Sequence, residues 1–298
     1  MTATKPFFSD GDVVDIGYRN VRAAEVDQLR WAREQCEALW DIYEPYADAE
    51  FLIEVRSNFD ARFWEMYLTT FLIKEGYEAI CPKPGPDVGF DFNGRRIWIE
   101  ATSPTRGAPG TMEQVPEVEH DGMMRSVPNE RMVLRYLNSI SEKYRRQYVS
   151  WLDNNIVSPR DAFVIAINPR RLRFDNHDTD PPRILQAGFM VGSPYMAIDR
   201  GTSKTVEAGY QFRDAITKAS GSSVAAGVFE NGEYCGLSGL LCSRVDAANQ
   251  PGEMGGDFQL VPNPHAKVAL PRDLRFKGIY YRIVRKGSGY TAYPERCG

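Results

Sequence analysis

The 298-residue chain has few of the side chains that most often build metal and redox sites. It contains three histidines and five cysteines, with no HExxH, HxH or CxxC spacing among them. An odd number of scattered cysteines argues against a disulfide framework and against a structural zinc site. A metal site built from histidines is disfavoured for the same reason of number and spacing.

The chain also lacks long apolar runs and an excess of positive charge. No run of about 18 apolar residues could span a bilayer, and the first ten residues, MTATKPFFSD, lack the apolar core of a secretory signal. We therefore expect a cytoplasmic protein with no membrane partner. The net charge is −4, so any contact with nucleic acid must come from a local basic surface.

Helical and strand patterns alternate along the first 170 residues, and this predicts an α/β fold. The expected elements are helices at 19–44, 47–56 and 59–75, a strand at 76–81, a hairpin at 85–102, a helix at 130–153 and a strand at 162–168. The last strand is apolar throughout, which is typical of a strand buried on both faces. Beyond it we expect a helix at 207–218 and strands at 224–229, 236–244 and 278–284.

The hairpin at 85–102 carries the most specific signal. Asn93-Gly94 suits a two-residue turn in which both positions need positive φ. The register that follows from this turn places Asp87 directly opposite Glu100. Because opposed side chains lie about 4.5–5.5 Å apart, two carboxylates there repel unless a cation, a proton or a basic group lies between them. The pair indicates either a solvated outer face or a site for a hard divalent cation.

Alternation along the two strands separates an apolar face from an acidic one. The predicted core face holds Val88, Phe90, Phe92, Ile97, Ile99 and Ala101. The other face holds Asp87, Asp91, Trp98, Glu100 and Thr102.

Glu65 stands inside the apolar helix at 59–75. An unpaired buried carboxylate is costly. We therefore expect Glu65 to be paired, bound to a metal, or on a solvated edge of this helix.

Pro86-Asp87 before the hairpin turn and Glu100-Ala101-Thr102 after it resemble the PD-(D/E)XK signature of the restriction-endonuclease-like nucleases. Thr102 stands where that superfamily usually has a lysine. The expected order of elements over about 59–168 also resembles the superfamily's αβββαβ core. The resemblance implies a catalytic core at 59–170, an N-terminal helical extension at 1–58 and a β-rich C-terminal extension at 171–298 that continues the core.

The resemblance further implies a nuclease that depends on Mg²⁺ or Mn²⁺ and hydrolyses phosphodiester bonds in DNA, in restriction or in defence against mobile DNA. Asp87 and Glu100 would then be catalytic and would bind the metal. Glu65 would join them from the preceding helix, as in many members of the superfamily, and the backbone carbonyl of Ala101 would be a further ligand.

The threonine at position 102 raises the question of the missing cation. Its hydroxyl can donate a hydrogen bond but carries no charge. A lysine has then moved, the enzyme works without one, or the site is inactive. Lys143, on the helix that follows, is the first candidate for a relocated catalytic lysine, and Lys83 is the second.

The helix at 130–153 carries the best local basic surface. A polar stripe recurs at intervals of four residues and predicts nucleic-acid contacts, with a solvated helix face as the alternative. The predicted contact residues are Arg131, Arg135, Lys143, Arg146 and Gln147. The long loop at 103–128, rich in Pro, Gly and acidic residues, is either a flap over the substrate or a simple insertion.

Two other interpretations remain open on the sequence alone. One is a catalytically inactive nuclease-fold module that binds nucleic acid or protein. The other is an unrelated α/β protein whose hairpin acids are solvated. The oligomeric state also stays open, a homodimer included.

Overall fold

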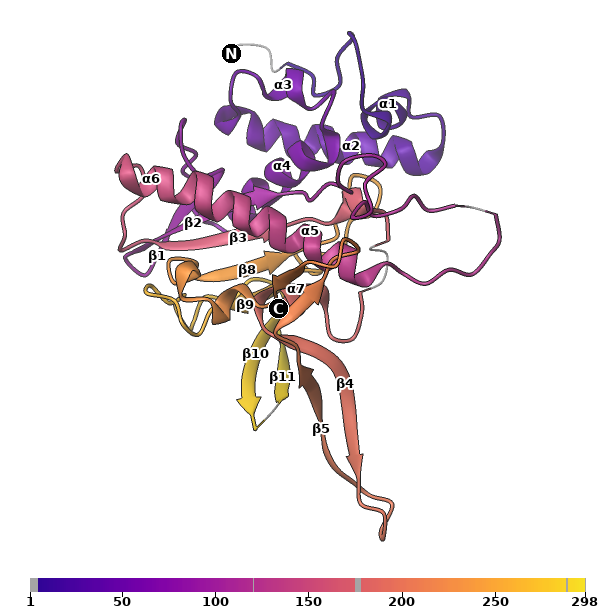
Figure 1. Cartoon of the computed structure of the whole chain (residues 1–298). Coiled ribbons are helices and arrows are strands. Elements are labelled where there is room, and N and C mark those ends of the chain that lie inside the picture. The colour runs from indigo at the N-terminus through magenta and orange to yellow at the C-terminus, as the bar shows by residue number, and fades with distance from the viewer. Residues whose placement is uncertain (1–4, 120, 175–177, 288, 298) are drawn as a thin grey trace.

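The computed structural model describes residues 5–119, 121–174, 178–287 and 289–297. In this part of the chain, nine strands form one mixed sheet in the order β1-β2-β3-β8-β9-β10-β11-β5-β4 (Figure 1). The strands are β1 Val88–Phe92, β2 Arg95–Thr102, β3 Ala162–Ile167, β4 Val191–Ile198, β5 Thr205–Phe212, β8 Gly239–Cys242, β9 Gln259–Pro262, β10 Gly278–Lys286 and β11 Gly289–Cys297. The short pair β6 Ala215–Thr217 and β7 Ser223–Ala225 is separate. The predicted α/β class is confirmed.

Helices cover both faces of this sheet. They are α1 Ile16–Ala23, α2 Asp27–Tyr43, α3 Phe51–Glu54, α4 Phe59–Lys74, α5 Asn129–Glu142, α6 Val149–Asp153 and α7 Arg183–Gly188. A π-helical segment, η2 Lys143–Tyr148, joins α5 to α6. Short 3₁₀ turns are η1 Glu44–Tyr46, η3 Arg170–Leu172, η4 Val228–Glu230 and η5 Gly232–Tyr234.

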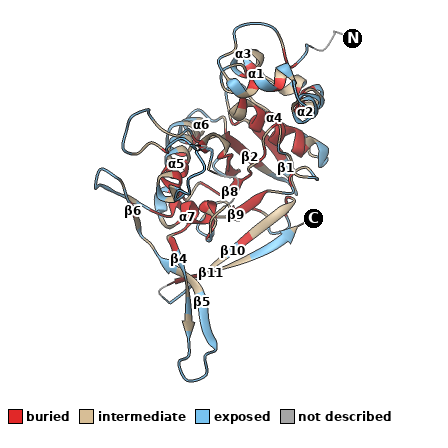
Figure 2. Ribbon diagram, turned by 90° about the vertical axis from the view of Figure 1, so that its right-hand side faces the viewer, coloured by how far each residue is buried: buried red, intermediate tan, exposed pale blue. Residues whose placement is uncertain are grey.

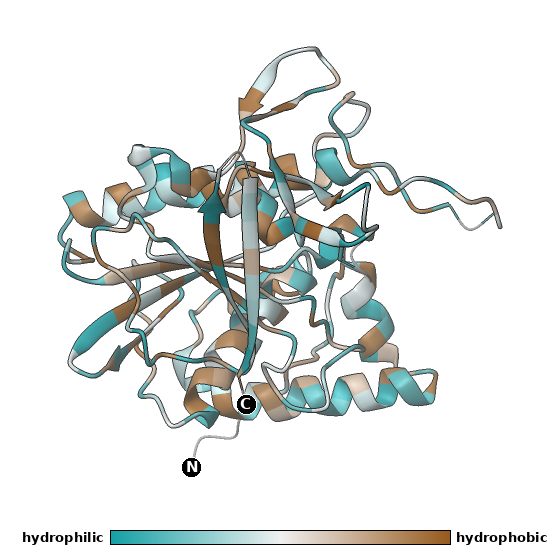
Figure 3. Cartoon of the chain, turned by 90° about the horizontal axis from the view of Figure 1, so that it is seen from below, coloured by the Kyte–Doolittle hydropathy of each residue, from teal (hydrophilic) through white to brown (hydrophobic). Residues whose placement is uncertain are grey.

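Strand β3 is buried along its whole length because it divides two hydrophobic cores. Val164 belongs to the core that also contains residues of α1, α2 and α4, whereas its neighbours Phe163 and Ile165 belong to the core that contains residues of α5 and α7. Full burial of each such side chain contributes about 1.5–3 kcal/mol. Figure 2 shows this buried interior, and Figure 3 shows the alternation of apolar and polar residues along the surrounding helices. The prediction of a strand covered on both faces is confirmed.

The predicted hairpin is confirmed with its register. Phe92 pairs with Arg95 and Val88 with Ile99, and Asn93 and Gly94 have positive φ of 48° and 74°. The apolar face lies in the core beneath α4, as expected. The opposite face is less solvated than expected, because Trp98 is only 4% exposed and packs in the second core.

The parallel pairing of β2 with β3 brings the two strand ends together. Strand β3 is in turn parallel to β8, and the C-terminal strands continue the same sheet. The helix predicted at 130–153 is present as α5, η2 and α6. The π-helical turn that begins at Lys143 was not predicted, because the spacing of apolar residues in the sequence indicates only a regular α-helix.

Three predictions for the N-terminal half are corrected. The helix expected at 19–44 is broken at Ala24, whose φ of 52° is left-handed, and the break lets α1 turn its buried face into the core shared with α2. The helix expected at 47–56 is reduced to the four residues of α3, because the Asp48 carboxylate accepts from the Glu50 amide in a competing turn. The strand expected at 76–81 is a single bridge between Ile80 and Gly89.

The prediction of a helix at 207–218 is wrong. Strand β5 pairs with β4 in a hairpin that projects from the body (Figure 1) and with β11 at its base. A Cβ at Gly209 would lie 2.7 Å from the carbonyl oxygen of Tyr290, so this glycine allows the close approach of two strands. The strand expected at 224–229 is also largely wrong, because β7 ends at Ala225 and a 3₁₀ turn follows. The strand expected at 236–244 is confirmed in part as β8, and the one at 278–284 is confirmed as β10.

The contact between Gly89 and Trp98 predicts a measurable loss of stability. An alanine Cβ at Gly89 would lie 2.3 Å from Cε3 of Trp98, and Trp98 is held by its indole N–H, which donates to Asp161 at 2.8 Å. We expect Gly89→Ala to lower the free energy of unfolding by roughly 1–3 kcal/mol in urea titrations. Gly232→Ala, where no atom lies within 4 Å of the new methyl group, is the control. Equal stability of the two variants would contradict this packing.

Candidate functional site

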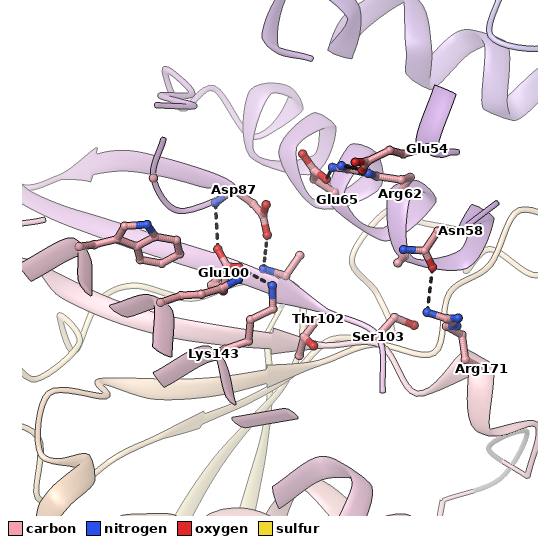
Figure 4. Close-up of a pocket in the computed structure, with 15 residues that line it drawn as sticks. Glu54, Asn58, Arg62, Glu65, Asp87, Glu100, Thr102, Ser103, Lys143 and Arg171 are labelled. Carbon is pink, nitrogen blue, oxygen red and sulfur yellow. Dashed lines mark hydrogen bonds and ion pairs between the residues drawn. The ribbon is translucent and has the colours of Figure 1, made fainter. Parts of the chain in front are cut away.

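A polar cavity of about 400 Å³ opens between α4, the end of β2 and η2 (Figure 4). Seven residues that the sequence analysis proposed for a site line this cavity: Glu65, Asp87, Glu100, Ala101, Thr102, Lys143 and Gln147. The other lining residues are Glu54, Asn58, Ala61, Arg62, Gly85, Ser103, Trp151 and Arg171. The fold thus gathers residues from four separate stretches of the sequence around one cavity.

Reciprocal hydrogen bonds hold Asp87 and Glu100 at the base of the hairpin. The backbone N–H of Asp87 donates to Oε2 of Glu100 at 3.2 Å, and the backbone N–H of Ala101 donates to Oδ2 of Asp87 at 2.7 Å. The paired register runs from Phe92–Arg95 to Val88–Ile99, so Asp87 and Glu100 are the next positions beyond its last pair. Both carboxylates are therefore fixed in orientation by the backbone.

Lys143 neutralises Glu100. Its Nζ lies 2.6 Å from Oε1 of Glu100, which is 2% exposed. Burial raises the pKa of the Glu100 carboxyl, and the ammonium of Lys143 opposes this rise. Burial alone would lower the pKa of Lys143, but the charges of Glu100 and Asp87 outweigh burial and raise it. The two side chains are therefore a buried ion pair.

Asp87 has no such partner. Among the described residues, no Lys, Arg or His side chain lies within ion-pair distance of its carboxylate. Burial, followed by the nearby charges of Glu100 and Glu65, raises the pKa of Asp87 well above its ordinary value. This end of the cavity therefore favours the addition of positive charge, as a proton or a cation.

Glu65 is buried and paired, so the alternative of a solvated helix edge is wrong for this residue. It is 4% exposed; its Oε1 accepts from the Tyr43 hydroxyl at 2.7 Å, and its Oε2 lies 2.6 Å from Nη1 of Arg62. Lys83, the second candidate lysine, is 3.7 Å from the same carboxylate. Glu65 thus lines the cavity, but its carboxylate is already paired with Arg62 and Lys83.

Gln147 lies one helical turn beyond Lys143 and also lines the cavity. Its Oε1 is buried and has no hydrogen-bond partner within the described part of the chain. Thr102 reaches the cavity from β2, and its carbonyl accepts from the Asn168 backbone at 2.9 Å. The hydroxyl of Thr102 supplies polarity but no charge.

The predicted basic stripe does not form one surface. Arg131 donates to the carbonyl of Gln114 at 3.2 Å, and Arg135 donates to that of Thr105 at 2.6 Å, so both hold the loop at 103–128 against the helix. Arg146 is exposed to solvent. Only Lys143 and Gln147 of the five predicted contact residues reach the cavity.

Sequence reasoning missed two arginines in the cavity wall. Arg62 pairs with Glu54 and Glu65. Arg171 follows the end of β3 and donates from Nη1 to Oδ1 of Asn58 at 2.8 Å. Asn58 precedes α4, and the first amide of that helix donates to Oδ2 of Asp15. A basic residue just beyond a buried parallel strand is the signal that could have found Arg171.

The side chains that line the cavity decide whether a metal ion could bind there. Within the described residues, no group of three or more Asp, Glu, His or Cys side chains is arranged to hold a metal ion. Mg²⁺, however, is usually held by one or two carboxylates and several waters. The cavity offers hard oxygen donors that fit such a hydrated ion. They are the carboxylates of Asp87 and Glu100 and the Oε1 of Gln147, which has no hydrogen-bond partner among the described residues.

Comparisons of the chain with protein-family models, with curated proteins and with solved structures give no match. The helices in the described residues are all too short or too polar to cross a membrane. The function must therefore be argued from the site itself.

The raised pKa of Asp87 predicts a stabilising variant. The folded carboxyl keeps its proton to higher pH than the unfolded one, so ionisation costs stability as pH rises above about 4. We expect Asp87→Asn, which never ionises, to raise the free energy of unfolding by about 1 kcal/mol at pH 7 in EDTA, with a gain that vanishes near pH 3.5. The measurement is urea unfolding across this pH range.

Asp91→Asn on the same hairpin is the matched control, since Asp91 is exposed and its pKa is lowered by the Arg96 guanidinium. The Asp91→Asn substitution should not raise the free energy of unfolding at any pH. An Asp87→Asn variant that is less stable at pH 7, or whose gain does not depend on pH, would contradict the electrostatic description of the cavity.

Proposed function

We propose that this cavity binds Mg²⁺ or Mn²⁺ and hydrolyses phosphodiester bonds of nucleic acid, DNA in particular. The observation that carries the proposal is the 2.6 Å contact between Lys143 Nζ and Glu100 Oε1, beside an Asp87 carboxylate that forms no ion pair with any described residue. Thr102 occupies the usual position of a catalytic lysine, and Lys143 brings an ammonium to the same cavity from a different element.

The order of elements supports a restriction-endonuclease-like core. Helix α4 is followed by the bridge at Ile80, then by β1, β2, α5 and the strand β3 parallel to β2. The first strand of an αβββαβ order is reduced to that bridge. The acids stand on the hairpin and the ammonium on the helix that follows it.

Each residue has a role in this proposal. Asp87 and Glu100 would hold the metal, with the Ala101 carbonyl as a further ligand. When bound, the metal would supply an activated water and would neutralise charge on the phosphate. Lys143 limits the negative charge around Glu100 and offers an N–H donor to a phosphate oxygen or to the attacking water. Thr102 offers a neutral donor.

A catalytically inactive module that binds nucleic acid is the second candidate. The observation that favours it is that no group of three or more Asp, Glu, His or Cys side chains is arranged to hold a metal ion among the described residues. Such a module would keep the cavity and the basic residues but would take up no divalent cation at Asp87.

A cleavage assay tests the proposal. We expect Asp87→Asn and Lys143→Met each to lower the initial rate of plasmid cleavage in Mn²⁺ by at least about 100-fold. Single-stranded DNA circles and RNA are assayed alongside, and urea unfolding checks the fold of each variant. Asp91→Asn, on the same hairpin but outside the cavity, should keep the rate of the unaltered protein.

Cleavage by Asp87→Asn at the unaltered rate would overturn the proposal. If the unaltered protein binds DNA but cleaves none of the substrates in Mg²⁺ or Mn²⁺, the binding module is the better description.

A further inference from the structure

Arg171 is the cation of the cavity that forms no ion pair with an acid in the described part of the chain. Three described cationic side chains line the cavity. Arg62 pairs with Glu54 and Glu65, and Lys143 pairs with Glu100. Arg171 instead donates to the neutral amide oxygen of Asn58 at 2.8 Å.

No described carboxylate lies within ion-pair distance of the Arg171 guanidinium. Four carboxylates line the same cavity, and each of them makes its hydrogen bonds and ion pairs with groups other than Arg171. The nearby Asp60 lies 3.8 Å from Arg173. Burial raises the pKa of the Asp60 carboxyl, and the charge of Arg173, with a smaller effect from Arg171, opposes this rise. The positive charge of Arg171 is therefore available to an anionic ligand.

The position of Arg171 is set by the ends of two parallel strands. The Asn168 backbone N–H donates to the Thr102 carbonyl at 2.9 Å, and Ser103 Oγ donates to the Asn168 carbonyl at 3.0 Å. Asn168 is itself buried, and its side-chain oxygen accepts from the Arg170 amide at 3.0 Å. The 3₁₀ turn η3 that carries Arg171 thus begins just after a residue, Asn168, that hydrogen bonds hold in place.

The cavity is divided by charge. Figure 4 shows Asp87, Glu100 and Lys143 at one end, Arg171 and Asn58 at the other, and Thr102 and Ser103 between them. A guanidinium has five N–H donors in a plane and matches the oxygens of a phosphate. The carboxylates in the wall disfavour a free anion. A phosphate that is part of a polymer is different, because the rest of the strand supplies further contacts.

We propose that Arg171, oriented by Asn58, binds a backbone phosphate next to the scissile one, so that it is a positioning residue for the nucleic-acid strand. This inference rests on the proposed function for its substrate class. It assigns a path to the nucleic-acid strand. The scissile phosphate lies at Asp87 and Glu100. The neighbouring phosphate lies over Thr102 and Ser103 and is bound by Arg171.

DNA binding without cleavage tests this assignment. The probe is a fluorescein-labelled 20-base-pair duplex in EDTA, and the measurement is fluorescence anisotropy over a series of salt concentrations. We expect Arg171→Gln to weaken binding roughly 10-fold and to reduce the slope of log K against log salt by about 1, the effect of one lost phosphate contact. Arg171→Lys should keep the slope, because it keeps the charge.

Arg173→Gln is the matched control. Arg173 lies two residues further along the chain, is half-exposed, pairs with Asp60 and does not line the cavity. It should leave both the affinity and the salt slope unchanged. The inference is overturned if Arg171→Gln keeps the affinity and slope of the unaltered protein, or if Arg173→Gln reduces them equally.

The experiments distinguish failure of the nuclease proposal from failure of the Arg171 assignment. If the unaltered protein cleaves DNA while Arg171→Gln changes neither the salt slope nor KM, the nuclease stands and the Arg171 assignment fails. If Arg171→Gln reduces the salt slope of DNA binding but neither the unaltered protein nor any variant cleaves DNA, the phosphate contact is supported and the nuclease proposal is contradicted. If the unaltered protein binds no DNA, both fail.

Discussion

The buried ion pair between Lys143 and Glu100 is the interaction on which the cavity depends. Glu100 stands on a strand whose two faces are both covered, and removing a carboxylate from water costs several kcal/mol unless a partner offsets it. Lys143 is that partner, at 2.6 Å. It is the first residue of a π-helical segment, and such segments are frequent at functional sites. The pair neutralises one acid, whereas its neighbour Asp87 forms no ion pair with the residues that the structure describes.

The N-terminal helices are part of this arrangement. Tyr43 at the end of α2 donates to Glu65, and Glu54 of α3 pairs with the same arginine as Glu65 does. Residues of α1, α2 and α4 share one hydrophobic core with β1, β2 and β3. The segment 1–58, described from the sequence as an extension, therefore supplies side chains to the wall of the cavity.

The sequence predicted best what local geometry determines. The Asn93-Gly94 turn determines the register of the hairpin, and through it the meeting of Asp87 and Glu100. The apolar pattern of β3 is enough to predict a strand covered on both faces. Lys143 could be proposed as well, from its place on the polar stripe of the helix that follows the hairpin.

The rest depends on contacts between distant segments. Strand β5 was mistaken for a helix because its pairing with β4 and β11 leaves no mark in its own composition. The arginines of α5 were expected on an open surface, but the loop at 103–128 folds back onto them. Arg171 reaches Asn58 across 113 positions of sequence, and no periodicity connects two such residues.

The central claim is that the Asp87 end of the cavity takes a divalent cation. An anomalous-difference map from crystals soaked in Mn²⁺ tests it most directly. We expect the strongest peak within about 2.5 Å of carboxylate oxygens of both Asp87 and Glu100, with Lys143 turned away from at least one Glu100 oxygen. A map with no peak there, while exposed acids elsewhere on the molecule bind the ion, would contradict the claim.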